Sequence, residues 1–499
     1  MNKGLSLFPL TALVVGSIIG SGMFNLPQNM AENAGGLAII IAWLITAVGM
    51  FCLTRLYQQL ALRRPNLLGG PYIYAREGFG DFVGFAVAWG RWIASMSGNA
   101  GYLVMIMAAI GGFSAFSFIG NGENLPGTIG ALIALWVTHL LCFMGVRTAA
   151  FVNTIITLAK LLPILFFIAV GAALFNSDIF ARSFWGPGGL DELMLRLQEN
   201  LTGGGGISAL FASPEARDIL FAQVKDSMLY TAWVFVGVES ASFYSARARD
   251  MKTVSRATVF GFAITMALYL GVSLLSLGLI PQAELAEMSN PSMRMIMAAV
   301  LGPEAAMVIN LGVIISIAGA FLAWTMLAAE SLYLTALDED DTGPRFFGRT
   351  NAKGAPTVAL WWTNIVVSIM LIASLIWGKG YNELILLATS MYLIPYFLNA
   401  LYGMGVAASP DAGGKRDISF MITCLLATLY GMWLIFAGGL DFLLVSMLIY
   451  APCIVLFLYR RHSDKKPLIK NKEELAAMLA LFFLALIALY MLLAGHIEL

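Results

Sequence analysis

Charged residues are scarce in this sequence. Asp, Glu, Lys and Arg make up only 12% of the 499 residues, whereas soluble domains carry about 25%. This deficit excludes an ordinary soluble globular protein. Basic and acidic residues number 29 each, so the chain has no net positive charge to attract nucleic acid. We therefore expect no nucleic-acid partner.

Cysteine and histidine are also rare. The four cysteines, Cys52, Cys142, Cys424 and Cys453, each lie in an apolar run, and no CxxC pair occurs. The three histidines are scattered, which argues against a histidine-based metal centre. The sequence also lacks HExxH and the GxxxxGK[ST] loop of ATP-driven pumps. We expect no metal, no cofactor and no enzymatic activity.

Hydrophobic residues, in contrast, make up 59% of the chain. A lipid-spanning helix needs about 20 apolar residues. Apolar segments of roughly this length predict an all-α integral membrane protein with 12–13 transmembrane helices. They lie near residues 7–30, 36–60, 82–113, 127–145, 150–175, 227–246, 256–280, 300–336, 357–377, 383–407, 418–438, 440–460 and 475–495.

The distribution of basic residues predicts the orientation. Cytoplasmic loops of membrane proteins are enriched in Lys and Arg. If the N-terminus is cytoplasmic, most of the 29 basic residues fall on the cytoplasmic side. We therefore expect a multi-pass plasma membrane protein with a cytoplasmic N-terminus.

We divide the chain into two parts. Residues 1–410 hold spans one to ten, and residues 411–499 hold three accessory spans. One extracellular connection, 176–226, is long and contains two helical-looking pieces, DELMLRLQENL and PEARDILFAQV, separated by GGGG. We interpret this connection as a solvated cap with a hinge; a gating lid is the alternative.

Glycine clusters interrupt two of the predicted spans. Gly20, Ser21 and Gly22 lie in the middle of span one, and Gly237 lies in the middle of span six. Non-helical backbone is tolerated in lipid only where it is buried or lines a cavity. Breaks at matching positions of two five-helix halves are typical of a transporter binding site at the bilayer midplane. For span one, close helix packing through Gly16-x-x-x-Gly20 is the alternative.

Each broken helix exposes N–H groups on one half and C=O groups on the other. The N–H groups attract a carboxylate, and the C=O groups accept hydrogen bonds from an ammonium group. Such a pair of helix ends suits the backbone of an amino acid. We therefore expect small-molecule amino acids and the lipid bilayer to be the partners of this chain.

Two charged residues inside spans are further candidates. Glu239 follows the break in span six, and Arg91 lies in span three. Charged residues within a membrane are usually functional or paired. We expect Glu239 and Arg91 to face one cavity; a purely structural ion pair is the alternative. Trp233 and Trp324 could hold a cationic group against their indole faces, although packing explains most tryptophans.

Several motifs resemble one superfamily. They are GSIIGSGMFNLPQNMAENAG in span one, GGPYIYAREGFG between spans two and three, WVFVGVESASFYSARARD in span six, GAFLAWTMLAAESLYLTALDEDD in span eight and ATSMYLIPYFLNALYG in span ten. Together they resemble the amino acid–polyamine–organocation superfamily, and most strongly its basic amino acid/polyamine antiporters, in particular the arginine:ornithine antiporters. The resemblance implies a LeuT-like core with a 5+5 inverted repeat, in which helices 1 and 6 are unwound mid-membrane.

The resemblance also implies roles for individual residues. Gly20, Ser21 and Gly22 would hold the substrate carboxylate. The full set of implied substrate-binding residues is Ile18, Gly20, Ser21, Gly22, Ala94, Ser95, Asn99, Trp233, Val236, Gly237 and Trp324.

Other members of this set would meet the rest of the substrate. Carbonyl groups near Ile18 and Val236 would accept the α-amino group. Trp233 would close over the substrate from outside, and Trp324 would lie beside the substrate side chain. The residues that would meet the distal cationic group are Asn99, Ala94 and Ser95.

Three residues would form gates by the same resemblance. Glu239 would be the gating, proton-responsive carboxylate, and Tyr396 in span ten would help to form an inner gate. Arg91 departs from the family pattern, in which a tyrosine occupies this position near Glu239. A guanidinium there could neutralise the carboxylate.

The function implied is a secondary active antiporter in a bacterial inner membrane. It would exchange a cationic amino acid for a related product, with arginine for ornithine as the leading pair. The alternatives are exchange of histidine for histamine or lysine for cadaverine, and a neutral amino-acid permease. Members of the superfamily commonly form dimers, so the resemblance implies a homodimer that no feature of the sequence itself indicates.

Overall fold

The structure is a computed structural model that describes residues 6–64, 66–67, 71–143, 149–190, 192–194, 210, 213–238, 251–337, 343–409 and 416–497. These residues form helices and connecting turns, and no β-strand occurs among them. The helices of the first half are α1 (Leu7–Ile18), α2 (Gly22–Asn33), α3 (Gly36–Arg63), α4 (Pro71–Phe79), α5 (Asp81–Gly111), α6 (Leu125–Phe143), α7 (Ala149–Ala173), α8 (Ser177–Arg182) and α11 (Pro214–Trp233). Those that follow are α13 (Met251–Leu277), α14 (Gln282–Ala286), α15 (Ser292–Leu301), α16 (Pro303–Leu337), α17 (Thr357–Trp377), α18 (Tyr381–Ala408), α19 (Ile418–Ala437), α20 (Gly439–Tyr450), α21 (Pro452–Ser463) and α22 (Lys472–Leu493).

The described helices confirm an all-α integral membrane protein. Ten helical stretches are long and apolar enough to cross a membrane, with α20 and α21 counted together as Gly439–Ser463. Helices α1 and α2 make an eleventh span if the bent pair counts as one. Two of the thirteen predicted segments fall outside that set. One coincides with α7 (Ala149–Ala173), and the other overlaps α11.

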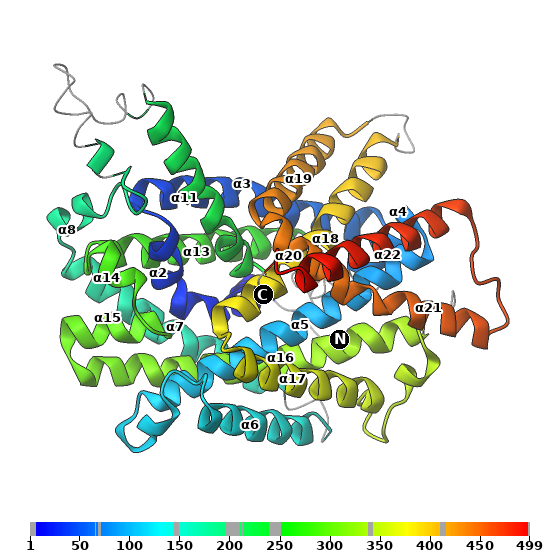
Figure 1. The fold of residues 1–499 in the computed structure, drawn as a ribbon, viewed down its shortest axis with the longest axis horizontal. Helices are drawn as coiled ribbons and strands as arrows, with labels where there is room; N and C mark the ends of the chain where they lie inside the picture. Colours follow the sequence, from blue (N-terminus) through cyan, green and yellow to red (C-terminus); the bar gives the residue numbers. More distant parts are fainter. Residues whose placement is uncertain are drawn as a thin grey trace.

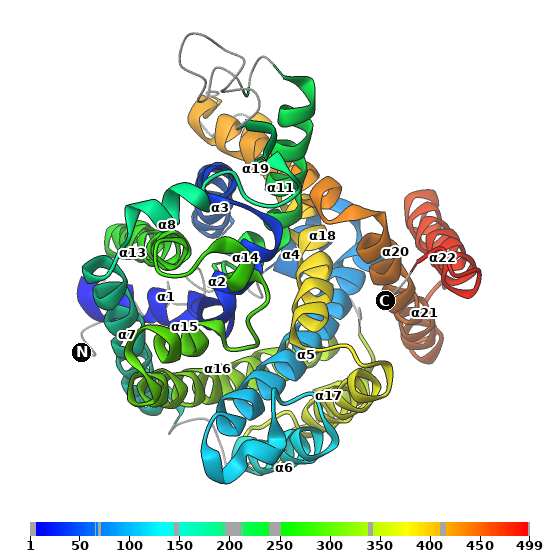
Figure 2. The same ribbon diagram turned by 60° about the vertical axis from the view of Figure 1, so that its left-hand side comes forward.

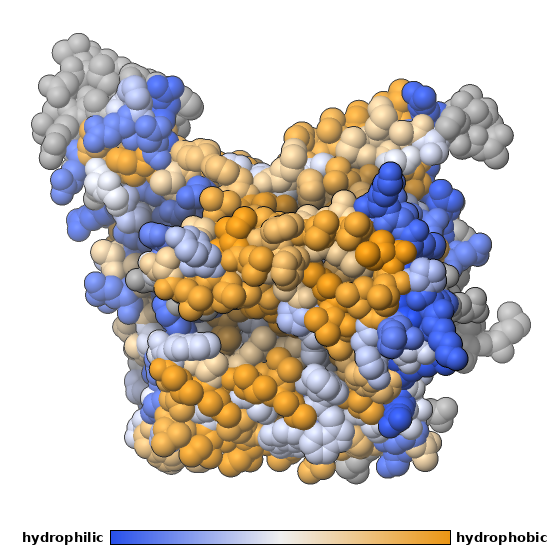
Figure 3. Space-filling view, turned by 45° about the vertical axis from the view of Figure 1, so that its right-hand side comes forward, coloured by the Kyte–Doolittle hydropathy of each residue, from blue (hydrophilic) through white to orange (hydrophobic). Residues whose placement is uncertain are grey.

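The outer helices expose large apolar side chains. Ile133 of α6, Ile376 of α17 and Leu493 of α22 are 61%, 72% and 79% exposed. Figure 3 shows a broad hydrophobic face with hydrophilic residues gathered towards its two edges. Apolar surface of this extent is typical of contact with a membrane.

Helix α5 lies at the centre of the bundle. The most apolar part of α5 is 94% buried, and the helix packs along α16 and α18. Figures 1 and 2 show α5 crossing the interior beside these two helices, with α6 and α17 outside them. A small residue allows the close approach to α18: a Cβ atom on Gly101 would lie 3.3 Å from the Ile385 side chain. Helix α5 is therefore the central helix, against which the surrounding helices pack.

The first predicted span is broken. Helix α1 ends at Ile18 and α2 begins at Gly22, with an angle of 47° between the two segments. Close approach accounts for the glycines. A Cβ atom on Gly20 would lie 2.6 Å from the Tyr102 hydroxyl, and one on Gly22 would lie 2.7 Å from Val234.

Helix α11 begins earlier in the chain than the sixth predicted span. The segment PEARDILFAQV is helical, but it runs without a break into the predicted sixth span instead of forming a separate extracellular piece. Ser213 caps the helix by accepting a hydrogen bond from the Ala216 N–H, and Pro214 occupies the first turn. The GGGG stretch and most of DELMLRLQENL lie outside the described residues.

Helix α11 ends at Trp233, and turns follow through residue 238. Phe235, Val236 and Val238 donate backbone hydrogen bonds to the residues three positions earlier. Gly237 has a φ of +104°, a conformation that side chains with a Cβ atom rarely adopt. The helix therefore ends before Gly237, and the tight turns that follow include this glycine.

Candidate functional site

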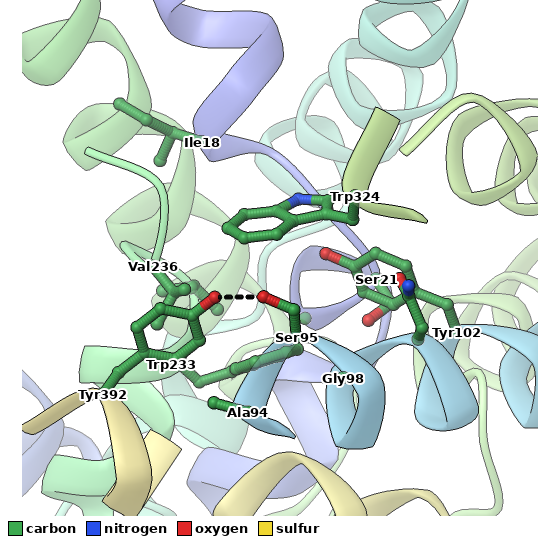
Figure 4. Close-up of a pocket in the computed structure, with 14 residues that line it drawn as sticks. Ile18, Ser21, Ala94, Ser95, Gly98, Tyr102, Trp233, Val236, Trp324 and Tyr392 are labelled. Atoms are coloured by element: carbon green, nitrogen blue, oxygen red, sulfur yellow. Dashed lines mark hydrogen bonds between the residues drawn. The ribbon is translucent and has the colours of Figure 1, made fainter. Parts of the chain in front are cut away.

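A cavity lies between the α1–α2 break, α5, the end of α11, α16 and α18. It is lined by Ile18, Gly20, Ser21, Gly22, Ala94, Ser95, Gly98, Asn99, Tyr102, Trp233, Val234, Val236, Trp324 and Tyr392. Figure 4 shows these residues converging from segments far apart in the sequence. Of the eleven substrate-binding residues predicted, all except Gly237 line this cavity.

The cavity is small in this conformation. The centre of a water molecule can occupy about 20 Å³ of it, which is room for roughly one ordered water. An amino acid would therefore need some of the lining side chains to move. Both tryptophans in the lining are nearly buried, Trp233 at 7% exposed and Trp324 at 9%.

The two interrupted helices are tied together behind the cavity. The Tyr269 hydroxyl of α13 lies 3.2 Å from the Ile18 carbonyl oxygen and 2.7 Å from that of Val234. Lys160 of α7 donates to the carbonyl groups of Gly16 and Ile19, the latter at 2.7 Å. These contacts satisfy carbonyl groups that the end of α1 leaves without helical partners. On the other side of the break, the first N–H groups of α2 suit an anionic group.

Aromatic rings form two walls of the cavity. Tyr102 and Trp233 are 6.2 Å apart between ring centroids, and Trp324 meets Tyr392 edge to face, also at 6.2 Å. The hydroxyl groups of Tyr392 and Ser95 share a hydrogen bond of 2.8 Å, which Figure 4 marks with a dashed line. Indole and phenol faces attract cations as well as packing against apolar stems.

The polar part of the lining is uncharged. The Asn99 amide donates to the Thr325 hydroxyl at 3.3 Å, while its carbonyl oxygen is buried without a hydrogen-bond partner. A buried acceptor without a partner costs about 1–3 kcal/mol, which a bound donor would recover. No charged side chain is among the residues described as lining the cavity. Hydrogen-bond acceptors and ring faces would therefore bind a cationic group here.

One lining hydroxyl is held from outside the cavity. Ser21 shares a hydrogen bond of 2.8 Å with the hydroxyl of Tyr381, the first residue of α18. The Tyr381 N–H also donates to Glu123 at 3.3 Å. This chain of contacts links the α1–α2 break to the start of α18.

Two of the three predicted gating residues, Arg91 and Tyr396, are not among the residues that line this cavity. Arg91 lines a second cavity, which also contains Glu330. Tyr396 is 1% exposed and lies between Tyr57 and Tyr392, with ring centroids 6.3 and 6.2 Å away. Glu239 lies outside the described residues, so its expected place beside Arg91 stays a prediction.

Four lining residues were not predicted: Gly98, Tyr102, Val234 and Tyr392. For Tyr102 a signal existed, because it lies one helical turn beyond Asn99 and two turns beyond Ser95 on the same helix. Tyr392 carried no such signal, since it meets Ser95 only through the packing of α18 on α5.

Comparisons with known proteins show the family to which this chain belongs. The model of the amino acid permease family matches residues 5–442. The chain is 39% identical to the arginine/ornithine antiporter of Pseudomonas aeruginosa, over 100% of this chain and 99% of that protein. It is 38% identical to a putative arginine/ornithine antiporter of Escherichia coli, over 99% and 100%.

A second group of relatives is somewhat less similar. The arginine/agmatine antiporter of Chlamydia abortus is 34% identical, over 98% of this chain and 97% of that protein. A solved Na⁺-coupled sialic acid symporter shares 10% identity with a TM-score of 0.48, over 88% of this chain and 90% of that one. The chain belongs to the amino acid permease family, a transporter family and not an enzyme class, and is a multi-pass membrane protein.

Proposed function

We propose that this protein is a secondary active antiporter that exchanges arginine for ornithine. The observation that carries the proposal is the full-length similarity, at 38–39% identity, to two proteins named as arginine/ornithine antiporters. Both substrates carry one net positive charge, so the exchange is electroneutral and the two concentration gradients drive it. We further propose a bacterial inner membrane with the N-terminus in the cytoplasm, and a 5+5 inverted repeat within residues 1–410.

In this proposal the substrate head group lies at the two helix breaks. Its carboxylate binds at Gly20, Ser21 and Gly22, where α2 begins. Its amino group binds the carbonyl groups near Ile18 and Val236. Support comes from the cavity, because all five residues line it and the N–H end of α2 faces the carbonyl end of α1 there.

The substrate side chain extends along α5 and α16. Its distal cation meets Asn99 and Ser95 beside Ala94, with Trp324 along its stem and Trp233 closing the outer side. The unpartnered carbonyl oxygen of Asn99 supports this assignment, since it can accept a hydrogen bond from a guanidinium or an ammonium group.

The gates are assigned in the same way. Tyr396 contributes to an inner gate, and Glu239 with Arg91 forms the gating, proton-responsive pair, whereas Gly237 belongs to the substrate-binding residues. A cavity with room for about one water suits the closed stage of an alternating-access cycle. Substrate shifts that cycle only through different affinities for its open states.

The test uses the purified full-length chain in liposomes loaded with labelled arginine. External ornithine should start efflux, and amine-free buffer should not. Efflux at the same rate in both media would contradict exchange. Ser21→Lys, which places a bulky cation at the carboxylate site, should abolish exchange, and Ser419→Lys at the start of α19 is the matched control.

A second exchange partner is favoured by one observation. Relatives at 33–34% identity are named as arginine/agmatine antiporters. Agmatine lacks the carboxylate, so it would leave the N–H end of α2 without an anionic partner. External agmatine in the same efflux assay separates the two candidates.

A further inference from the structure

The first residue of α18 holds one of the residues that line the substrate cavity. Tyr381 is buried, and its hydroxyl group shares a hydrogen bond of 2.8 Å with the Ser21 hydroxyl at the α1–α2 break. Its ring packs on α5, where a Cβ atom on Gly101 would lie 3.5 Å from it. Ser21 lines the cavity, but Tyr381 is not among the lining residues. Any effect of Tyr381 on a bound substrate therefore passes through its neighbours.

The contacts of the Tyr381 hydroxyl favour one direction for its proton. The hydroxyl also has a hydrogen-bonding contact with the Trp233 side chain. An indole N–H group can only donate, so the Tyr381 oxygen is the acceptor in this contact. Donation of the Tyr381 proton to the Ser21 oxygen then satisfies both hydroxyl groups. A hydroxyl group that accepts one hydrogen bond can donate another, so Ser21 keeps its own proton for an acceptor in the cavity.

The position of Tyr381 is fixed by Glu123, which lies in the turn before α6. The Tyr381 N–H donates to Glu123 at 3.3 Å, and the Asn121 amide donates to the same carboxylate at 2.6 Å. A carboxylate is favourable there because the first N–H groups of a helix have no helical partner and carry partial positive charge. A Cβ atom on Gly380 would overlap with the Glu123 carboxylate, so the glycine allows this contact.

We propose that Tyr381, held in place by Glu123, is a positioning residue that directs the Ser21 proton towards the substrate carboxylate, and that it thereby contributes to a preference for substrates that keep their carboxylate. The inference rests on the proposed function, which places that carboxylate at Gly20, Ser21 and Gly22. A hydrogen bond to a charged group contributes more than one between neutral groups. A decarboxylated amine such as agmatine brings no anion to the aligned proton and gains nothing from it.

The test measures the uptake of labelled arginine and of labelled agmatine by the full-length chain in ornithine-loaded liposomes. The wild type should prefer arginine. Tyr381→Phe keeps the ring but leaves the Ser21 proton without a fixed direction. We expect it to lower the arginine-to-agmatine ratio of kcat/KM about tenfold, equal to about 1.4 kcal/mol. Tyr402→Phe, the same change near the other end of α18, is the matched control and should keep the ratio.

A double substitution separates positioning from packing. Ser21→Ala removes the hydroxyl that Tyr381 directs, so it should also lower the ratio. In the Ser21→Ala background, Tyr381→Phe should lower the ratio no further, because Tyr381 acts through Ser21. Additive losses would contradict the proposal, and so would an unchanged ratio in a folded Tyr381→Phe. Equal uptake of arginine and agmatine by the wild type would overturn it too.

Glu123 provides an independent measurement outside the predicted spans if Tyr381→Phe fails to fold. Glu123→Ala removes the acceptor of the Tyr381 N–H and should shift the ratio in the same direction as Tyr381→Phe. Glu123→Gln keeps an oxygen as acceptor and should restore most of the ratio. Equal losses of arginine and agmatine uptake in Glu123→Ala would show that Glu123 only stabilises the fold, which would overturn its part in the proposal. The proposed function fails separately, if the wild type does not exchange arginine for ornithine.

Discussion

Tyr269 places a single hydroxyl group between the ends of two interrupted helices. It contacts the Ile18 carbonyl group where α1 ends and the Val234 carbonyl group where α11 ends. Its ring is held by stacking on Trp43, with centroids 5.7 Å apart. Ile18 and Val234 both line the cavity. The residue therefore positions the site without lining it.

Replacing Tyr269 by Phe tests this role. The ring would still stack on Trp43, but the single hydroxyl donor that the two carbonyl groups share would be lost. We expect the free energy of unfolding in detergent to fall by about 1–3 kcal/mol, together with weaker arginine binding. Tyr459→Phe, at a tyrosine that is 55% exposed, should change neither quantity. Equal melting temperatures for wild type and Tyr269→Phe would contradict the assignment.

Trp233 is expected to bind the substrate cation through its ring face. Trp233→Leu keeps an apolar side chain but removes the π system, so arginine affinity measured by calorimetry should fall at least about tenfold, consistent with about 2 kcal/mol for a desolvated cation–π contact. Trp233→Phe retains an aromatic face, so its arginine affinity should lie between those of the wild type and Trp233→Leu. Unchanged affinity in Trp233→Leu would show that packing is its only role.

The sequence predicted the residues that interrupt helices or line the cavity more readily than the residues that hold these in place. Gly20 and Gly237 were visible because glycine within an apolar span marks either close helix packing or a break in the helix. Tyr269 and Tyr381 were not, because their partners are main-chain or hydroxyl groups in distant segments. Ordinary tyrosines in apolar helices carry no local sign of such contacts.

At the scale of helices, sequence patterns predicted apolar spans better than boundaries. The start of α11 was missed because its first turns are polar and resemble a solvated segment. The start of α19, in contrast, lies close to the predicted boundary and has a side-chain cap. Asp417 accepts a hydrogen bond from the Phe420 N–H at 2.9 Å and pairs with Arg63 of α3, so it both begins α19 and fastens α19 to a neighbour.

The Asp417 cap predicts that the stability of the fold depends on pH. The Phe420 N–H, aided by the Arg63 guanidinium, lowers the pKa of Asp417 below its usual value. The folded state therefore binds fewer protons than the unfolded state, and Asp417 stabilises the fold above the unfolded pKa of about 3.9. This contribution is lost as the pH falls through the lowered folded value.

Asp417→Asn isolates the charge, because asparagine is an equally good helix cap. The wild type should be slightly more stable than Asp417→Asn at neutral pH, and the difference should shrink as the pH falls below about 3.9. Thermal unfolding of both proteins between neutral pH and about pH 3 measures it. The effect is modest because the carboxylate is 41% exposed. A difference that stays constant with pH would exclude the ionised carboxylate as its source.

At the scale of the whole molecule, ion pairs join the last two helices to the central one. Arg461 of α21 pairs with Asp81 at the start of α5, at 3.0 Å, and with Glu474 of α22, at 3.1 Å. Arg461 and Glu474 are 4% and 6% exposed. Figure 2 shows α21 and α22 at the edge of the bundle. The predicted accessory segment 411–499 is thus fastened to the helix that forms the cavity wall.

Glu474→Gln tests whether this fastening matters for the site. Removing one partner of a buried ion pair costs about 3–5 kcal/mol, so the melting temperature should fall clearly. Because Asp81 begins the helix that carries Ser95 and Asn99, arginine affinity should fall as well. Asp226→Asn removes an exposed ion pair with Lys225 and should leave both quantities unchanged. A lower melting temperature with full affinity would mean that α22 stabilises the bundle without positioning α5.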